Sequence, residues 1–151
     1  MKQDASALPV ETVFDVRDRC LCLISQRAAR KVARRFDIAF RPLGITNGQF
    51  SLMMALAAPK AWNMTQLSDF LGMDRTTLTA AVATLKRRKL VKLVTSEEDQ
   101  RAKRVLLTHS GQKLTTLAVP VWRAEHERLD QELTNEGAAQ VRSALLLLSA
   151  T

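Results

Sequence analysis

The segment 65–111 constrains the fold of this chain more than any other part of the sequence. Apolar residues recur in it at helical spacing on both sides of Gly72, which predicts two short helices over 65–71 and 75–88. Asp74 stands directly before the second helix, where its carboxylate is suited to act as an N-cap. Two short helices joined at a glycine are typical of a helix-turn-helix.

A charged hairpin is predicted immediately after the second helix. The basic run 86–89 leads into two segments, 91–95 and 103–108, that have the composition of β-strands. Between them lies the segment 96–102, which is too polar for a protein core. A helix-turn-helix followed by a basic hairpin predicts a winged helix-turn-helix, a fold that places its second helix in the major groove of DNA.

The N-terminal part of the chain predicts one long helix. No glycine or proline occurs from Glu11 to Arg41, and apolar residues recur along this run at helical spacing. Such a run predicts a single helix of about thirty residues, about 45 Å long. A helix of that length needs an apolar partner along its side, and a second copy of the chain could supply it.

A shorter helix should follow and lie in the core. Thr46 and Gln49 have the spacing of a capping box. The residues that follow, from Phe50 to Ala57, are almost wholly apolar. This helix should extend to about Ala58, because Pro59 ends it.

Two further helices are predicted after the hairpin. The first should be capped by Thr108 or Ser110, reach about Leu133 and be kinked at Pro120. Thr134 should cap the last helix.

Residues 145–148 in the last helix are four consecutive leucines, which cover every face of a helix. A terminal helix of a monomer rarely buries all its faces, so we expect the two ends of the chain to form a dimer interface. The expected organisation is a single domain over 1–151, in which dimerisation helices at 11–45 and 111–151 flank a winged helix-turn-helix at 46–110. The predicted fold class is mainly α with a small β-hairpin wing.

The charge of the chain is concentrated around the predicted helix-turn-helix. The chain carries a net charge of +8, and residues 60–110 hold ten basic and five acidic groups. A basic patch on one structural unit is the electrostatic feature expected of a phosphate-binding surface, although a merely solvated basic surface is the alternative. No apolar run is long enough to span a bilayer and no secretory signal is evident, so no membrane association and a cytoplasmic location are expected.

Three motifs carry a family resemblance. They are Gly44-Ile45-Thr46-x-x-Gln49-Phe50, Leu67-x-x-x-Leu71-Gly72-x-Asp74-x-x-Thr77-Leu78-Thr79, and Asp99-Gln100-Arg101-Ala102-Lys103-Arg104 followed by Leu107-Thr108-x-x-Gly111. Together they cover about residues 44–114 and resemble the second helix, the helix-turn-helix and the wing of the MarR family of bacterial regulators. The resemblance implies a homodimer that binds double-stranded DNA, usually as a repressor, and is released by a small molecule or an oxidant. Ala80 departs from the family pattern, since many relatives carry a basic residue there.

These observations together give a set of candidate DNA contacts. They are Thr65, Gln66, Arg75, Thr76, Thr77, Thr79, Lys86, Arg87, Arg101, Lys103 and Arg104. Arg75 and the threonines should contact bases in the major groove, with the alternative that Thr76 and Thr77 only satisfy the start of the helix. Thr65 and Gln66 are better placed for phosphates.

Arg101 should enter the minor groove. By resemblance Asp99 orients Arg101; the alternative is a surface salt bridge between the two.

The sequence offers two kinds of candidate effector site, a reactive cysteine and a binding site for an aromatic acid. By resemblance, Cys22 stands at a position where some relatives sense organic hydroperoxides, which gives a thiol-based oxidant sensor as an alternative function. Cys20 is expected to be a core residue, and on a continuous helix the two cysteines point about 200° apart and cannot join within the chain.

Candidates for binding an aromatic acid are Arg17, Arg30, Phe36, Phe50 and Trp62, although residues of these kinds are more often core or surface residues than ligand contacts.

No catalytic set is found. His109 and His126 stand in no metal motif, and the glycines form no phosphate-binding loop. We therefore expect neither an enzyme nor a cofactor nor a metal. A winged helix that binds protein instead of DNA, and a thiol-dependent oxidoreductase using Cys22, are the competing classes of function.

Overall fold

The computed structural model describes residues 8–60, 62–95 and 103–150. The chain divides into two compact units, residues 1–35 and 36–151, which are described separately. None of the helices in these described ranges combines the length and the apolar character that crossing a membrane requires.

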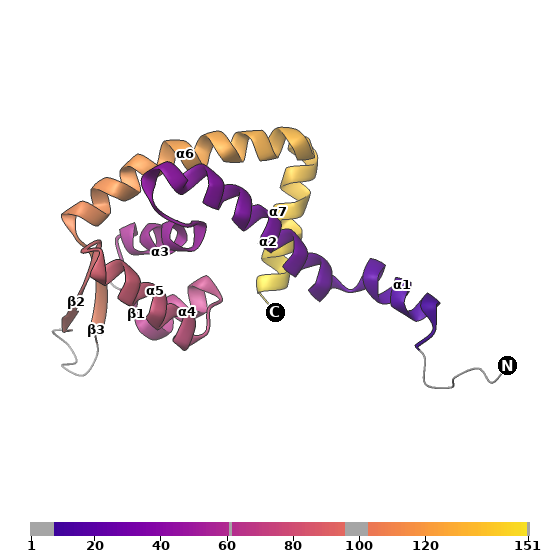
Figure 1. Cartoon of the computed structure of the whole chain (residues 1–151), viewed down its shortest axis with the longest axis horizontal. Helices are drawn as coiled ribbons and strands as arrows, with labels where there is room; N and C mark the ends of the chain where they lie inside the picture. The colour runs from indigo at the N-terminus through magenta and orange to yellow at the C-terminus, as the bar shows by residue number, and fades with distance from the viewer. Residues whose placement is uncertain (1–7, 61, 96–102, 151) are drawn as a thin grey trace. The chain divides into compact units, whose positions relative to one another are not determined.

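The first unit contains a break that the sequence pattern did not predict. Helix α1 covers Val10–Arg19 and helix α2 covers Leu21–Phe40, so the single helix expected from Glu11 to Arg41 is wrong (Figure 1). At Cys20 the backbone turns to an extended conformation, with φ −71° and ψ 103°.

Hydrogen bonds on both sides of Cys20 make this break possible without glycine or proline. Its amide donates to the Val16 carbonyl at 3.0 Å, which closes α1, and its own carbonyl accepts from the Ile24 amide at 3.0 Å. The Leu23 amide donates to Cys20 Sγ at 3.5 Å, so the sulfur takes the place of an N-cap oxygen for α2.

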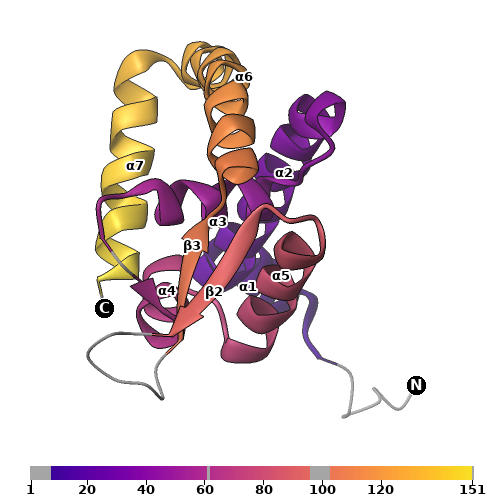
Figure 2. The ribbon, with the colours of Figure 1, turned by 90° about the vertical axis from the view of Figure 1, so that its left-hand side faces the viewer.

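The second unit is a winged helix-turn-helix with two further helices, and its fold class is as predicted (Figures 1 and 2). After the end of α2, its elements are the 3₁₀ turn Arg41–Leu43, α3 (Asn47–Ala57), β1 (Trp62–Asn63), α4 (Met64–Leu71), α5 (Arg75–Arg87), β2 (Val91–Thr95), β3 (Lys103–Leu107), α6 (His109–Leu133) and α7 (Asn135–Ser149). The helices and the two hairpin strands predicted from the sequence are confirmed to within a few residues.

The sheet has three strands in the order β1-β3-β2, all antiparallel. The hairpin pairs Val91 with Leu107 at its base and Thr95 with Lys103 at its outer end. The short strand β1, which pairs Trp62 with Val105, was not predicted because two residues are too few to show a period. Figure 2 shows β2 and β3 extending beside α5.

The core of the second unit lies between α3, the helix-turn-helix and the base of the hairpin. Its largest fully buried side chains are Phe40, Leu52, Met53, Leu67, Leu78, Leu85 and Val105. Phe40 packs on Phe50 with ring centroids 4.7 Å apart. The indole of Trp62 donates from Nε1 to the Ala55 carbonyl at 2.7 Å, which satisfies both groups in the interior.

The predicted capping box at the start of α3 is confirmed. The Gln49 amide donates to Thr46 Oγ1 at 3.2 Å, and the Thr46 amide donates to Gln49 Oε1 at 3.2 Å. Just before it, Gly44 has φ +66°, a left-handed conformation that glycine adopts without strain and that ends the preceding turn.

Helix α6 begins in close contact with the end of the recognition segment. Its cap is Thr108, whose Oγ1 accepts from the Gly111 amide at 3.1 Å and donates to the Lys89 carbonyl at 2.7 Å. A Cβ added to Gly111 would lie 2.0 Å from the Leu90 carbonyl oxygen. Only glycine fits at this point without movement of the backbone.

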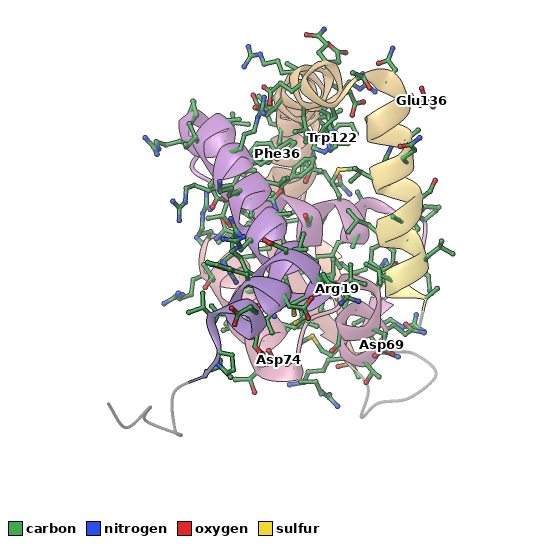
Figure 3. All side chains as sticks on the ribbon, turned by 90° about the vertical axis from the view of Figure 1, so that its right-hand side faces the viewer. Arg19, Phe36, Asp69, Asp74, Trp122 and Glu136 are labelled. Carbon is green, nitrogen blue, oxygen red and sulfur yellow. The ribbon has the colours of Figure 1, made fainter. Side chains whose placement is uncertain are left out.

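Helix α6 continues through Pro120 without a break, and it follows a curved path in Figure 1. Thr134 caps α7 as predicted, since its Oγ1 accepts from the Gly137 amide at 3.2 Å. In Figure 3, Trp122 lies on α6 and Glu136 lies in the first turn of α7. The leucines 145–148 near the end of α7 are all exposed in the single chain, Leu147 to 72%.

Candidate DNA-binding site

The start of α5 is fixed by Asp74, as the sequence predicted. Asp74 Oδ1 accepts from the Thr77 amide at 2.8 Å and Oδ2 accepts from Thr77 Oγ1 at 2.6 Å. These bonds, led by that from the Thr77 hydroxyl, lower the pKa of the Asp74 carboxyl from its ordinary value of 3.8. The Thr77 hydroxyl is thus engaged at the helix start, which is the structural alternative stated for it above.

One face of α5 is buried and the opposite face is exposed. Leu78, Val82 and Leu85 anchor the helix in the core. The exposed face, here called the recognition stripe, consists of Arg75, Thr76, Thr79, Ala80, Ala83, Lys86 and Arg87. A helix held by its apolar side and presenting a cationic, small-residue side is suited to lie in a major groove.

Helix α4 begins with a second capping box, which the sequence reading missed. The Gln66 amide donates to Asn63 Oδ1 at 2.9 Å, and the Asn63 amide donates to Gln66 Oε1 at 3.1 Å. The signal was present as Asn63-x-x-Gln66, but the start of the helix was placed at Thr65. Thr65 and Gln66 are both exposed, as phosphate contacts require.

The basic side chains around α5 differ in their exposure and in the hydrogen bonds that they make. Lys86 and Arg87 are exposed, and Arg87 Nη2 donates to Thr84 Oγ1 at 3.3 Å. Arg88 reaches back to α3, where its Nη1 donates to Gln49 Oε1 at 3.3 Å. On β3, Lys103 is exposed and Arg104 is half-buried.

The predicted minor-groove residue Arg101 and its partner Asp99 lie outside the described residues.

Comparison with known proteins decides the family. A model of the MarR family matches residues 43–102. The transcriptional regulator MosR of M. tuberculosis is 31% identical to the chain, with a TM-score of 0.72, over 88% of this chain and 96% of MosR. The chain belongs to the MarR family.

Two DNA complexes are among the structures that this MarR-family chain resembles. One is the transcriptional repressor CouR bound to a 23-mer DNA duplex, with 26% identity, a TM-score of 0.79 and coverage of 95% of this chain and 99% of CouR. The other is MosR of M. tuberculosis in complex with DNA, with 32% identity, a TM-score of 0.66 and coverage of 83% and 98%. Comparison with curated proteins gives no match.

The chain is therefore a DNA-binding transcription regulator of the MarR family rather than an enzyme.

The predicted effector residues of this MarR-family regulator are not gathered into one site within the second unit. Phe36, Phe50 and Trp62 are buried, with little surface to offer a ligand. In the first unit, Arg17 is paired with Asp18 at 2.6 Å, and Arg30 Nη1 donates to the Gln26 side chain at 3.3 Å. The interpretation of the three aromatic residues as core residues is thus favoured.

A surface cavity of about 590 Å³ lies elsewhere, between the end of α3, the wing strands and the start of α6. Its lining residues are Met54, Leu56, Ala57, Ala58, Lys92, Leu106, Leu107, Gln112, Thr115, Thr116 and Val119. Among these residues Lys92 is the charged one. Sequence reasoning missed this cavity, because its apolar residues come from three elements, α3, β3 and α6, and share no periodic pattern. Within the described ranges, no group of three or more His, Cys, Asp or Glu side chains could hold a metal ion.

Of the two cysteines, Cys20 differs from the expectation, while the sensing role of Cys22 stays a prediction. Cys20 is half-buried at the helix break rather than in a core, and Cys22 is exposed on α2. Cys22 Sγ accepts from Gln26 Nε2 at 3.1 Å. Since Cys20 is not helical, the angular argument against joining Cys20 to Cys22, which assumes a continuous helix, no longer applies.

Proposed function

We propose that this protein is a homodimeric repressor that binds a pseudo-palindromic operator and leaves it when a small organic anion binds. The observation that carries the proposal is the recognition stripe of α5, a cationic face of small residues held outward by a buried apolar face. The similarity to CouR, a repressor bound to a DNA duplex, supports the repressor role.

Exposed apolar surface supports the homodimer. In the single chain the leucines 145–148 of α7 are exposed, and so are Val13, Phe14 and Val16 of α1. Clusters of exposed large apolar side chains, taken in each unit by itself, usually mark an interface between proteins. Two copies would present two recognition stripes to half-sites about one helical turn of DNA apart. Sedimentation at micromolar concentration tests this, and a monomer would contradict it.

The test of DNA binding is a mobility-shift titration at several salt concentrations, on duplexes selected from a random pool. Each phosphate contact should add about −0.9 to the slope of log K against log salt, so a slope near zero would exclude the electrostatic account. Arg75→Ala should weaken binding to the selected duplex by about 1–3 kcal/mol and relax its sequence preference. Arg123→Ala, which removes an exposed charge from α6, is the matched control and should leave binding unchanged.

Failure to retard any duplex in dilute buffer would favour the competing class, a winged helix that binds protein. In that case there would be no DNA binding for Arg75→Ala to weaken.

The effector proposal rests on the cavity lined by Lys92. Pockets of a few hundred Å³ with apolar walls and a few polar groups are typical of small-molecule sites, and a single ammonium favours a monoanion. A thermal-shift titration with benzoate, phenylacetate and their methyl esters tests this. The acids should raise the melting temperature and weaken DNA binding, and Lys92→Met should remove both effects. Should Arg17→Ala or Arg30→Ala remove them instead, the effector site predicted from the sequence would be supported.

A thiol-based oxidant sensor is the second candidate, favoured by the exposure of Cys22 and by the helix break at Cys20. Peroxide or diamide should then lower DNA affinity in the native protein and not in Cys22→Ser. Mass spectrometry distinguishes oxidation of Cys22 alone from a Cys20–Cys22 disulfide. Unchanged affinity after oxidation would exclude this candidate.

A further inference from the structure

The hydroxyl of Thr79 is already engaged within its own helix. Thr79 Oγ1 donates to the Arg75 carbonyl at 2.6 Å, and the same type of bond joins Thr84 to Ala80 at 3.0 Å. Threonines in helices commonly make this bond to the carbonyl one turn back. The single hydroxyl proton of Thr79 is therefore not available to an acceptor on a DNA base. The methyl group, the other branch at Cβ, makes no such bond.

The neighbours of Thr79 on the recognition stripe also present methyl groups. Thr76, Ala80 and Ala83 are exposed there, and each ends in a methyl. Helix α5 contains no Asn or Gln, the side chains that pair with adenine, and no Asp or Glu, which accept from cytosine. Arg75 is the long polar side chain in its first turn and is suited to guanine.

Thymine is the base whose major-groove edge carries a methyl group, at C5. We propose that Thr79 and the alanines beside it recognise thymine through contacts between methyl groups, next to a guanine recognised by Arg75. On this proposal the operator half-site contains a guanine with thymine next to it. This inference rests on the proposed function, because it requires that α5 binds DNA.

The test replaces thymine by uracil, which lacks the methyl and keeps every hydrogen-bonding group. The full-length protein first selects duplexes from a random pool, and each thymine of the selected duplex is then replaced singly by deoxyuridine. Loss of one buried methyl contact should weaken binding about fourfold at one or two positions, which corresponds to about 0.8 kcal/mol. Thymines outside the contacted positions serve as internal controls.

Variants of Thr79 assign the effect to the methyl. Thr79→Ser keeps the hydroxyl and removes the methyl, so at the position that Thr79 contacts it should bind the thymine and uracil duplexes equally. Thr79→Val keeps a methyl and removes the hydroxyl, so it should retain the fourfold difference. Thr84→Ser is the matched control: Thr84 is a half-buried threonine of α5 outside the recognition stripe whose Oγ1 donates to the Ala80 carbonyl at 3.0 Å, and its change should leave the difference intact. Circular dichroism melting checks that each variant folds.

The outcomes separate this inference from the proposed function. If the native protein selects no duplex, the proposed function fails and this inference fails with it. If it selects a duplex but uracil costs nothing at any position, the inference is overturned and the proposed function stands. If Thr79→Val loses the difference while Thr79→Ser retains it, the hydroxyl makes the contact, which also overturns the inference.

Discussion

Replacing Gly111 by alanine should destabilise the fold at the junction between the recognition segment and α6. The new Cβ would lie 2.0 Å from the Leu90 carbonyl oxygen and 3.1 Å from Leu107 Cδ2. Because Cβ atoms essentially never approach another heavy atom within 3.0 Å, the two backbones must separate by about 1 Å. That movement strains the hydrogen bond from the Thr108 amide to the Leu90 carbonyl at 3.0 Å and the neighbouring bond from the Thr108 hydroxyl to the Lys89 carbonyl at 2.7 Å.

Two costs and one gain determine how much stability Gly111→Ala should lose. Overpacking of a well-filled site costs about 1–3 kcal/mol, and weakening one or two hydrogen bonds costs about 1 kcal/mol each. Alanine recovers up to about 1 kcal/mol through its higher helix propensity. The net loss in the free energy of unfolding should thus lie between about 1 and 5 kcal/mol.

Urea denaturation at fixed protein concentration measures this loss, and the control is another helical glycine. A Cβ on Gly48, in the first turn of α3, would meet nothing nearer than Thr46 Oγ1 at 4.0 Å. Gly48→Ala should therefore be neutral or stabilise the fold by up to about 1 kcal/mol. The reasoning is refuted if Gly111→Ala unfolds at the same urea concentration as the native protein, or at a higher one.

Two further changes test the structure. Hydrogen bonds from Thr77 lower the pKa of Asp74, so the stability that this cap provides is present above the ordinary value of 3.8 and is lost as the pH falls through the lowered pKa. The melting temperature of Asp74→Ala should hence lie below that of the native protein at pH 7, and the gap should close in acid; a gap independent of pH would contradict the cap. Trp62→Phe should cost about 1–3 kcal/mol in urea denaturation, because the buried Ala55 carbonyl loses the indole donor 2.7 Å away; an unchanged midpoint would show that this bond contributes nothing.

The sequence predicted best those features that depend on local backbone chemistry. Thr46, Asp74, Thr108 and Thr134 cap their helices as expected, since each cap is a hydrogen bond between residues three positions apart. The apolar periodicity of α5 likewise fixed which side is buried. A cap at Asn63 was overlooked, although its spacing carried the same signal.

The remaining features depend on distant contacts or on unusual local choices. The strand β1 exists because β3 pairs with it, so Trp62 and Asn63 show no strand pattern by themselves. The break at Cys20 rests on a sulfur acceptor, which no propensity rule favours at a helix start. In the candidate site, the hydroxyl of Thr79 bonds to the Arg75 carbonyl, and the residue type alone does not show whether the hydroxyl or the methyl is left free.

The two residues of β1 link the wing directly to the helix-turn-helix. Asn63 pairs with Arg104 on β3 through its backbone, while its side chain holds the first turn of α4. A displacement of the hairpin is therefore transmitted to α4 directly through the pairing of β1 with β3, and not by way of α5. Because α4 packs against α5, any event that tilts the base of the wing should also move the helix-turn-helix.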